Sequence, residues 1–335
     1  MGVTVKQQAI DEKQMIAAAE GALADISRTR EAVGRVVFGQ ETVVERTMVA
    51  ILAGGHALLV GVPGLAKTKL VETLGTVLGL DSRRIQFTPD LMPSDILGSE
   101  VMEQDDNGKR YFRFIPGPVF SQLLMADEIN RASPRTQSAL LQSMQEYHVT
   151  VAGARHDLPA PFHVLATQNP LEQEGTYPLP EAQLDRFLMQ VDILYPDIEA
   201  ERRILLETTG VEEAKAENVL TSQRLREIQA LIRRMPVPET VVEAILDLVR
   251  SARPGNGDAA TDKHVAWGPG PRASQALTLC ARARALYDGR LAPSVDDVHA
   301  LAEPVLQHRM ALTFSARAEG MNVRDVIARL VKEGS

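Results

Sequence analysis

The sequence predicts an α/β fold in which a core with a mainly parallel β-sheet precedes a C-terminal all-helical region. Up to about residue 195, short apolar runs alternate with segments of helix length. This alternation is typical of parallel strands joined by helices that cover both faces of a sheet. After Tyr195-Pro196 only helical patterns follow, so we expect a second, helical domain to begin near residue 197.

The length and composition indicate an ordinary folded protein of about two domains. The chain has 335 residues, of which 44% are hydrophobic and 24% are charged. Its net charge of −8 gives no bulk support for a nucleic-acid partner, and we expect none. The sequence contains no signal peptide and no run of about 18 apolar residues, which predicts a cytoplasmic protein without membrane insertion. The one cysteine, Cys280, is expected to be a buried thiol in a reducing compartment.

The first half of the chain supplies the expected elements of the core. A helix is expected over residues 5–34, where apolar residues recur at loose helical spacing, and a second over 40–53 leads into an apolar strand at 57–60. A short strand at 85–88 ends at Pro89. The same patterns predict helices at 69–80 and 133–146, and strands at 123–126 and 163–167.

Two β-hairpins are expected between elements of this core. In the first, β-prone segments at 101–104 and 110–114 flank a turn that contains Asn107-Gly108, a strong hairpin signal. In the second, segments at 149–151 and 156–158 flank a short turn with a glycine. They are either long connections or functional insertions.

The C-terminal region is predicted to be helical throughout, with one long loop over residues 253–270 that is rich in Gly, Pro and polar residues. Ser222 and Ser294 are plausible helix caps, and Asp297 follows Ser294 at the spacing of a capping box. The expected helices cover residues 198–208, 222–234, 239–251, 271–288, 294–306 and 323–332.

Residues 59–68, with the sequence LVGVPGLAKT, place a glycine-rich turn between an apolar strand and a helix. Such a turn cradles phosphates with backbone N–H groups, while Lys67 neutralises β/γ oxygens and the Thr68 hydroxyl reaches Mg²⁺. The glycine usual before the lysine is Ala66 here, which fits if Ala66 has a negative φ. A turn without a ligand is the alternative for this motif alone. The expected cofactor-binding residues of this segment are Gly61, Pro63, Gly64, Leu65, Ala66, Lys67, Thr68 and Lys69.

Polar side chains follow the next buried strands. Asp127 and Glu128 end the apolar run at 123–126, where ligands bind in parallel sheets. We expect Asp127 to hold Mg²⁺ and Glu128 to polarise an attacking water, although a solvated strand end would look the same in isolation. Asn169 follows the strand at 163–167, and its amide can orient that water or contact a γ-phosphate. Together these residues favour hydrolysis of a nucleoside triphosphate.

Two arginines are candidates for the remaining positive charge. Arg186 follows a proline-bounded loop, and Arg272 starts a helix of the second domain. An arginine supplied by a neighbouring molecule can raise the rate of phosphoryl transfer by about 10³–10⁵. Each could instead be a surface ion-pair partner that contributes little.

In this order, these residues resemble the AAA+ ATPases of the MoxR type, and the resemblance covers nearly the whole chain. MoxR-type proteins accept alanine before the lysine of the phosphate loop. Each motif is weak alone, whereas the ordered set is specific. The motifs are Phe38-Gly39-Gln40 and residues 61–68, 87–95, 117–120, 126–132, 136–141, 166–170, 179–187 and 271–274.

The resemblance implies an AAA+ αβα core with a five-stranded sheet and a helical lid. The expected division is an N-terminal helical segment (1–35), a nucleotide-binding core (36–196) and a lid (197–335). The hairpins at 101–114 and 147–160 resemble the helix-2 insert and the pre-sensor-1 insert of this AAA+ branch.

The resemblance also implies roles for single residues. Asn169 resembles sensor 1, Arg186 the arginine finger placed in the neighbouring subunit's site, and Arg272 the sensor 2 arginine that reaches from the lid to the γ-phosphate. Lys67 and Thr68 would be the Walker A pair, and Asp127 and Glu128 the Walker B pair. Gly39 and Gln40 would contact adenine through their backbone, and Arg131 would make either an intersubunit contact or an ion pair.

The expected function is that of a ring-forming, chaperone-like motor that hydrolyses ATP with Mg²⁺. The resemblance implies a homo-oligomeric ring, a hexamer by family pattern, and a partner with a von Willebrand factor A domain. Two alternatives stay open: a metal-chelatase motor subunit, or a nucleotide-gated scaffold with little turnover. DNA helicase activity is disfavoured by the acidic balance.

Overall fold

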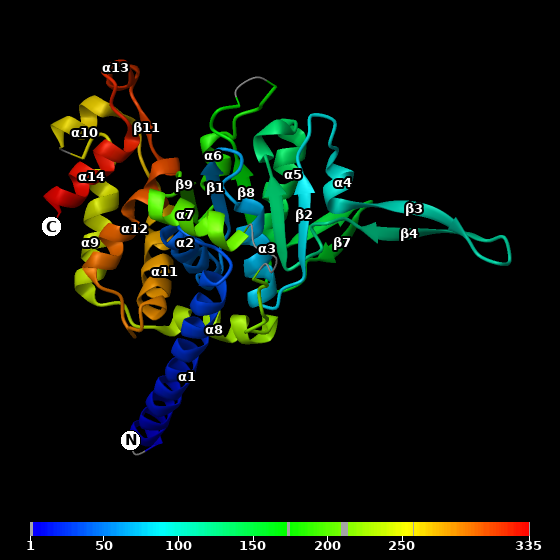
Figure 1. Ribbon diagram of the computed structural model, residues 1–335, viewed down its shortest axis with the longest axis horizontal. Helices are drawn as coiled ribbons and strands as arrows, with labels where there is room; N and C mark the ends of the chain where they lie inside the picture. The colour runs from blue at the N-terminus through cyan, green and yellow to red at the C-terminus, as the bar shows by residue number, and fades with distance from the viewer. Residues whose placement is uncertain (1–2, 173–174, 209–213, 257, 335) are drawn as a thin grey trace.

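The computed structural model describes residues 3–172, 175–208, 214–256 and 258–334, with side chains from residue 17 onward. Figure 1 shows a central sheet, a group of C-terminal helices on one side of it, and a long hairpin on the other side. The helix α1 (Val3–Gly34) extends away from this body at its N-terminal end. A helix over residues 5–34 is therefore confirmed.

The central sheet has five strands, and all of its pairs are parallel. In spatial order the strands are β2 (Ser82–Gln86), β5 (Leu123–Asp127), β8 (His163–Gln168), β1 (Ala57–Gly61) and β9 (Met189–Ile193). The four separately predicted strands are confirmed within a few residues. The edge strand β9 was not among them, although Met189, Val191 and Ile193 alternate as buried residues. From the C-terminal region, Gln307 Nε2 donates to the Gln190 carbonyl (3.1 Å) beside this edge.

The helices expected in the core are confirmed with shifted ends: α2 (Glu41–Leu52), α3 (Lys67–Val77) and α5 (Pro134–Glu146). Ser133 ends the loop before α5, and its side chain accepts a hydrogen bond from the Thr136 backbone. This satisfies one of the N–H groups that a helix N-terminus leaves unpaired. Short helical turns complete the core at α4 (Pro93–Leu97), η1 (Ile129–Arg131) and α6 (Glu181–Leu184).

Both predicted hairpins are present. The first joins β3 (Gly98–Gln104) to β4 (Arg110–Pro116) and is the arm that projects from the body in Figure 1. The second joins β6 (His148–Val151) to β7 (Ala154–Asp157). The two hairpins touch where Phe114 stacks on His156, with ring centroids 3.9 Å apart.

The C-terminal region is helical, as predicted, but it also contains a small ribbon. Two predictions for this region are corrected. The expected loop over 253–270 contains a helix and a strand, and the cap of α8 is Thr221 rather than Ser222. Within that loop, Asp258 caps a helix by accepting hydrogen bonds from the Ala260 and Thr261 N–H groups. Val265 pairs with Leu312, which is about fifty residues away in the sequence, and no local pattern reveals such a pairing. Gly257 lies outside the described residues. The elements are α7 (Ile198–Thr208), α8 (Ser222–Arg234), α9 (Glu239–Ser251), α10 (Ala259–His264), β10 (Val265–Trp267), α11 (Pro271–Tyr287), α12 (Val295–Leu306), η2 (Gln307–Arg309), β11 (Ala311–Leu312), α13 (Phe314–Ala318) and α14 (Val323–Glu333).

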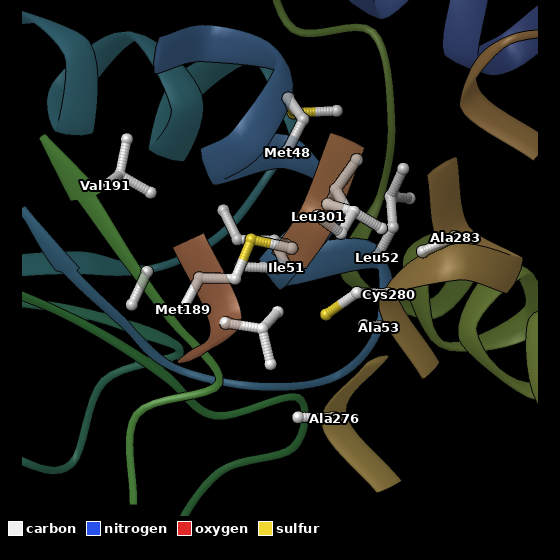
Figure 2. Packing of buried hydrophobic residues seen from close by; sticks show 14 of the residues in the cluster. Met48, Ile51, Leu52, Ala53, Met189, Val191, Ala276, Cys280, Ala283 and Leu301 are labelled. Atoms are coloured by element: carbon white, nitrogen blue, oxygen red, sulfur yellow. The ribbon is translucent and has the colours of Figure 1, made fainter. Parts of the chain in front are cut away.

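One hydrophobic cluster joins the sheet to the C-terminal helices. Figure 2 shows Met48 of α2 and Met189 of β9 beside Cys280 of α11 and Leu301 of α12. Cys280 is fully buried, as predicted, and burial raises the pKa of its thiol. Among the described residues, no helix is both long and apolar enough to cross a membrane.

Candidate functional site

The turn between β1 and α3 holds the predicted phosphate loop. Lys67 is the first residue of α3, and its Nζ donates to the carbonyls of Gly61 (2.7 Å) and Val62 (2.8 Å). Burial lowers the pKa of Lys67, while the charges of Asp127 and Glu128 act in the opposite direction. The lysine is therefore held beside two carboxylates at the N-terminus of an α-helix, where anions are stabilised.

The backbone of Ala66 corrects one prediction. Ala66 has φ +54° and ψ +24°, in the left-handed region, rather than the negative φ that was expected. For an L-residue with a Cβ this conformation costs about 1–2 kcal/mol. Ala66 is the N-cap of α3 and its carbonyl accepts the Leu70 N–H (2.9 Å), so the left-handed angle lies where the phosphate loop joins the helix. The loop thus keeps the conformation for which glycine is usual and pays a small strain.

A threonine not assigned from the sequence orders the two carboxylates. Thr167, near the end of β8, donates from Oγ1 to Asp127 Oδ1 (2.5 Å) and accepts from the Glu128 N–H (2.9 Å). Asp127 is the last residue of β5, which lies beside β8 in the sheet. The available signal was a threonine that follows the apolar run Val164-Leu165-Ala166 and lies two residues before the candidate Asn169.

The Glu128 carboxylate is held from two sides. Gln86 Nε2 donates to Glu128 Oε2 (2.7 Å), and Arg131 Nη1 pairs with the same oxygen (2.9 Å). Arg131 therefore forms an ion pair, one of the two predicted alternatives, with a candidate catalytic group. The Glu128 backbone has φ +54°, a strained conformation of the kind found at active sites.

A second arginine, Arg84 on β2, binds the Asp127 carboxylate. Its Nη2 lies 2.6 Å from Asp127 Oδ2 and 3.0 Å from Gln86 Oε1. No role was predicted for Arg84 and Gln86, because β2 is polar apart from Ile85 and such a strand usually faces solvent. Their position depends on the pairing of β2 with β5.

A cavity of about 450 Å³ joins these groups. Asn169 is 5% exposed and lies in its wall, and its Oδ1 accepts from the Leu171 N–H (3.1 Å). The amide NH₂ is then the part of Asn169 that can donate to an oxygen of a ligand. The cavity is lined by Pro63, Gly64, Leu65, Ala66, Lys67, Thr68, Lys69, Asp127, Glu128, Thr167 and Asn169.

A second, more apolar cavity of about 160 Å³ shares the wall formed by residues 64–66 and Lys69. Gln40 lies in it, and its Nε2 donates to the Leu65 carbonyl (2.9 Å), while its buried Oε1 has no partner among the described residues. Val36, Phe38 and the α7 residue Ile204 supply apolar wall. An apolar slot with one buried acceptor fits a purine that carries an exocyclic amine.

Two glycines predicted to bind the cofactor, Gly39 and Gly61, lie where other elements pack closely against the backbone. Gly39 is absent from the described lining of that slot, and at φ +69° a Cβ on it would meet Ala200 Cβ at 2.3 Å. A Cβ on Gly61 would lie 2.9 Å from the Ile193 carbonyl. Gly39 thus allows α7 to approach, and Gly61 allows β9 to pair closely with β1.

The residues also fit a magnesium nucleotide. Thr68 and Asp127 line the phosphate cavity and would supply oxygen ligands there, and Mg²⁺ prefers one or two protein oxygens together with substrate phosphates. No cluster of three or more His, Cys, Asp or Glu suited to a metal occurs in the described ranges.

A third cavity, of about 290 Å³, holds the two predicted arginines. Arg186 and Arg272 line it together with Arg233, Arg309 and Asp185, so four arginines and one acidic residue lie around this cavity. Burial, and then the charge of Arg272, lower the pKa of Arg186. Within the described part of the chain, the guanidinium groups of Arg186 and Arg233 make no hydrogen bond or ion pair. We call this the arginine cavity.

The arginine cavity and the phosphate cavity lie at opposite ends of β1. Gly55 and His56, which precede β1, line the arginine cavity, whereas the phosphate loop follows Gly61 at the other end. Five residues of strand separate them, or roughly 16 Å. The expectation that Arg272 reaches the γ-phosphate from the lid is therefore not met within one chain, because α11 begins at the arginine cavity, where Arg272 Nη1 lies 3.4 Å from Asp185 Oδ2.

Comparisons with known proteins agree with this site. Residues 56–189 match the model of the ATPase family associated with various cellular activities (AAA), and residues 257–330 match an AAA lid domain. Chaperone MoxR1 of Mycobacterium tuberculosis is 42% identical over 94% of this chain and 84% of its own length.

Two further matches span most of the chain. Protein MoxR of Methylorubrum extorquens is 30% identical over 85% of this chain and 87% of its own length. The crystal structure of a candidate ATPase from Cytophaga hutchinsonii has a TM-score of 0.89 and 38% identity, over 96% of this chain and 98% of that one. The chain therefore belongs to the MoxR family of AAA+ ATPases.

Proposed function

We propose that this protein hydrolyses ATP in a ring of identical subunits, and that each active site is shared between two neighbours. One subunit supplies the phosphate loop and the carboxylates. The next subunit supplies Arg186 and Arg272. The observation that carries the proposal is the placement of these arginines in a cavity with surplus positive charge, at the end of β1 remote from Lys67.

In the nucleotide half of the site, each group has a defined task. Lys67 and the α3 N-terminus bind the β- and γ-phosphates, and Gln40 offers its buried Oε1 to adenine. Thr68 and Asp127 would hold Mg²⁺, which would neutralise phosphate charge. Glu128, fixed by Gln86 and Arg131, accepts the proton of the attacking water, and Asn169 donates to that water or to the γ-phosphate.

In the arginine half, the positive charges of Arg186 and Arg272 stabilise the negative charge that develops on the γ-phosphate of the neighbouring subunit's nucleotide. In the described residues no hydrogen bond or ion pair joins the Arg186 side chain to a carboxylate, although the charge of Glu146 partly offsets the lowering of its pKa by burial and by Arg272. A triphosphate from the neighbouring subunit would supply the missing negative charge. Such an arginine contributes about 10³–10⁵ in rate, so an isolated subunit would be nearly inactive.

We further propose that the motor remodels partner proteins and that these partners include a protein with a von Willebrand factor A domain. Membership of the MoxR family supports this, as does the name chaperone of one relative. The hairpin β3–β4, which projects from the body, is a suitable surface for transmitting movement. A cytoplasmic location accords with the lack of a membrane-spanning helix in the described ranges.

Mixing two inactive variants tests the shared site. Arg186→Ala retains the nucleotide half, and Lys67→Ala retains the arginine half. We expect each alone to be nearly inactive and their mixture to regain ATPase activity, with a maximum at intermediate ratios. Activity that stays at background at every ratio would refute the shared site. Negligible ATP hydrolysis by the unmodified protein, both with and without a partner protein, would instead favour the nucleotide-gated scaffold.

A further inference from the structure

The segment that carries Arg186 is held by one buried arginine from the lid. Arg309 is 2% exposed and follows α12 in the turn η2. All five of its N–H donors are used: four bonds go to residues 185–188, and one goes to Val305 in the preceding helix α12. The four are Nε to Asp185 Oδ1 (2.7 Å), Nη2 to the carbonyls of Asp185 (3.2 Å) and Phe187 (2.7 Å), and Nη1 to the Leu188 carbonyl (3.2 Å).

His308 adds a second contact to the same segment. Its Nε2 lies 3.1 Å from the Phe187 carbonyl, so the neutral ring donates a hydrogen bond there. The ring is buried, and burial together with the Arg309 charge keeps the pKa of His308 well below its usual range. The Phe187 carbonyl therefore accepts from two consecutive lid residues.

This attachment holds Arg186 and Arg272, two of the four arginines that line the arginine cavity. Arg186 lies inside the held segment, between Asp185 and Phe187. Asp185 binds Arg309 through Oδ1 and Arg272 through Oδ2 (3.4 Å). The Asp185 carboxylate thus links Arg309 to Arg272 of α11, and Asp185 directly precedes Arg186 in the sequence.

We propose that Arg309 is a positioning residue that sets Arg186 for the neighbouring subunit's nucleotide and couples its position to the lid. The inference rests on the proposed shared site. Arg309 would not touch the nucleotide, because its donors are all occupied. A rotation of α12 would move the carbonyl contacts at 185–188 and with them Arg186.

The variant Arg309→Met tests this inference in the full-length protein. Methionine retains apolar bulk but offers no donor, and misplacing a catalytic group by about 1 Å can cost about 10²-fold in rate. We expect kcat to fall about 10–100-fold while the KM for ATP changes less than about twofold, because ATP binds at the other end of β1.

A matched control is Arg324→Met, which removes another contact between the lid and the sheet. Arg324 Nη2 lies 2.5 Å from Asp192 Oδ2, beyond the segment that carries Arg186. We expect this variant to keep kcat within about twofold. An equal loss in both variants would mean that any weakening of the lid contact slows the enzyme, and would overturn the specific role of Arg309.

Complementation separates positioning from a structural role. Mixed with Lys67→Ala, Arg309→Met should regain activity, since its own nucleotide half is intact. Mixed with Arg186→Ala, it should not, because both variants lack a working arginine half. If Arg309→Met does not fold, Arg309→Lys serves instead: it keeps a cation beside Asp185 but has three donors in place of five, and the same pattern is expected.

The pairs also tell the two proposals apart. If Arg186→Ala regains activity with Lys67→Ala but the Arg309 variant does not, the positioning role is wrong and the shared site stands. If neither mixture regains activity, the shared site is wrong and the inference falls with it.

Discussion

At the scale of single residues, backbone strain occurs at two residues of the candidate nucleotide site. Ala66 and Glu128 both have a positive φ, and they lie on the two sides of the phosphate cavity. The sequence located both residues correctly, because motif spacing identifies a loop and a strand end. It could not give their backbone angles, since the φ of Ala66 follows from how the loop closes onto α3.

The left-handed angle of Ala66 leads to a paired prediction. Ala66→Gly should retain ATP binding and lie within about 1 kcal/mol of the unmodified protein in stability, because relief of strain offsets the added freedom of the unfolded chain. Ala66→Val should bind ATP poorly, because a β-branched residue tolerates positive φ badly. Thermal unfolding and titration with a fluorescent ATP analogue would measure both. Normal binding by the valine variant would show that the loop changes conformation when loaded.

Thr167 leads to the second prediction at this scale. Thr167→Val keeps the shape but removes the bond to Asp127 and the acceptor for the Glu128 N–H. Groups that orient metal ligands typically contribute about 10–100-fold in metal affinity or activity, and we expect a loss of kcat in that range. Thr167→Ser should stay near the normal rate. Steady-state ATPase assays over a range of Mg²⁺ concentrations would distinguish weaker metal binding from slower chemistry.

At the scale of elements, the strands that the sequence predicted are those with local signals. The buried runs of β1, β5 and β8 are apolar and continuous, whereas β9 alternates and is completed by the lid at its outer edge. The ribbon β10–β11 joins segments far apart in sequence. Arg84 and Gln86 likewise acquire their partners only through the pairing of β2 with β5. A local sequence pattern carries no information about such long-range strand pairing, so these contacts could not be predicted from it.

Buried histidines at the strand starts give a pH prediction. His56 Nδ1 accepts from the Val164 N–H (2.9 Å), and His163 Nδ1 lies 2.8 Å from the Gly55 carbonyl, where it donates. Burial lowers the pKa of His56 to about 3 and that of His163 to about 4, from 6.5. Below pH 6.5 the unfolded chain therefore binds protons that the folded chain excludes.

Stability should consequently be full above about pH 6.5 and fall as the pH drops toward 4. Each of these histidines contributes up to about 1.4 kcal/mol per pH unit between the two pKa values. Urea unfolding at pH 7.5, 6.0 and 5.0 would measure the slope. His163→Asn, which keeps a donor toward Gly55 but does not titrate, should reduce it; an unchanged slope would assign the effect to other groups.

At the scale of the whole molecule, the sheet and the C-terminal helices form a single unit. The cluster around Cys280 contains residues of α2, β9, α11 and α12, so a lid movement must preserve or slide this contact (Figure 2). The sequence predicted both halves of the chain and their order. It did not predict that α11 would bring Arg272 to the arginine cavity, because the orientation of the lid depends on this packing.

The most direct measurement of the central claim is a cryo-EM structure of Glu128→Gln with ATP and Mg²⁺. This variant should bind ATP and hydrolyse it very slowly, because the amide cannot accept the proton of the attacking water. We expect a ring in which the Arg186 guanidinium of one subunit lies about 3 Å from the γ-phosphate held by Lys67 of the next. A ring whose nucleotide is bound while Arg186 faces solvent, or lies remote from every γ-phosphate, would contradict the account.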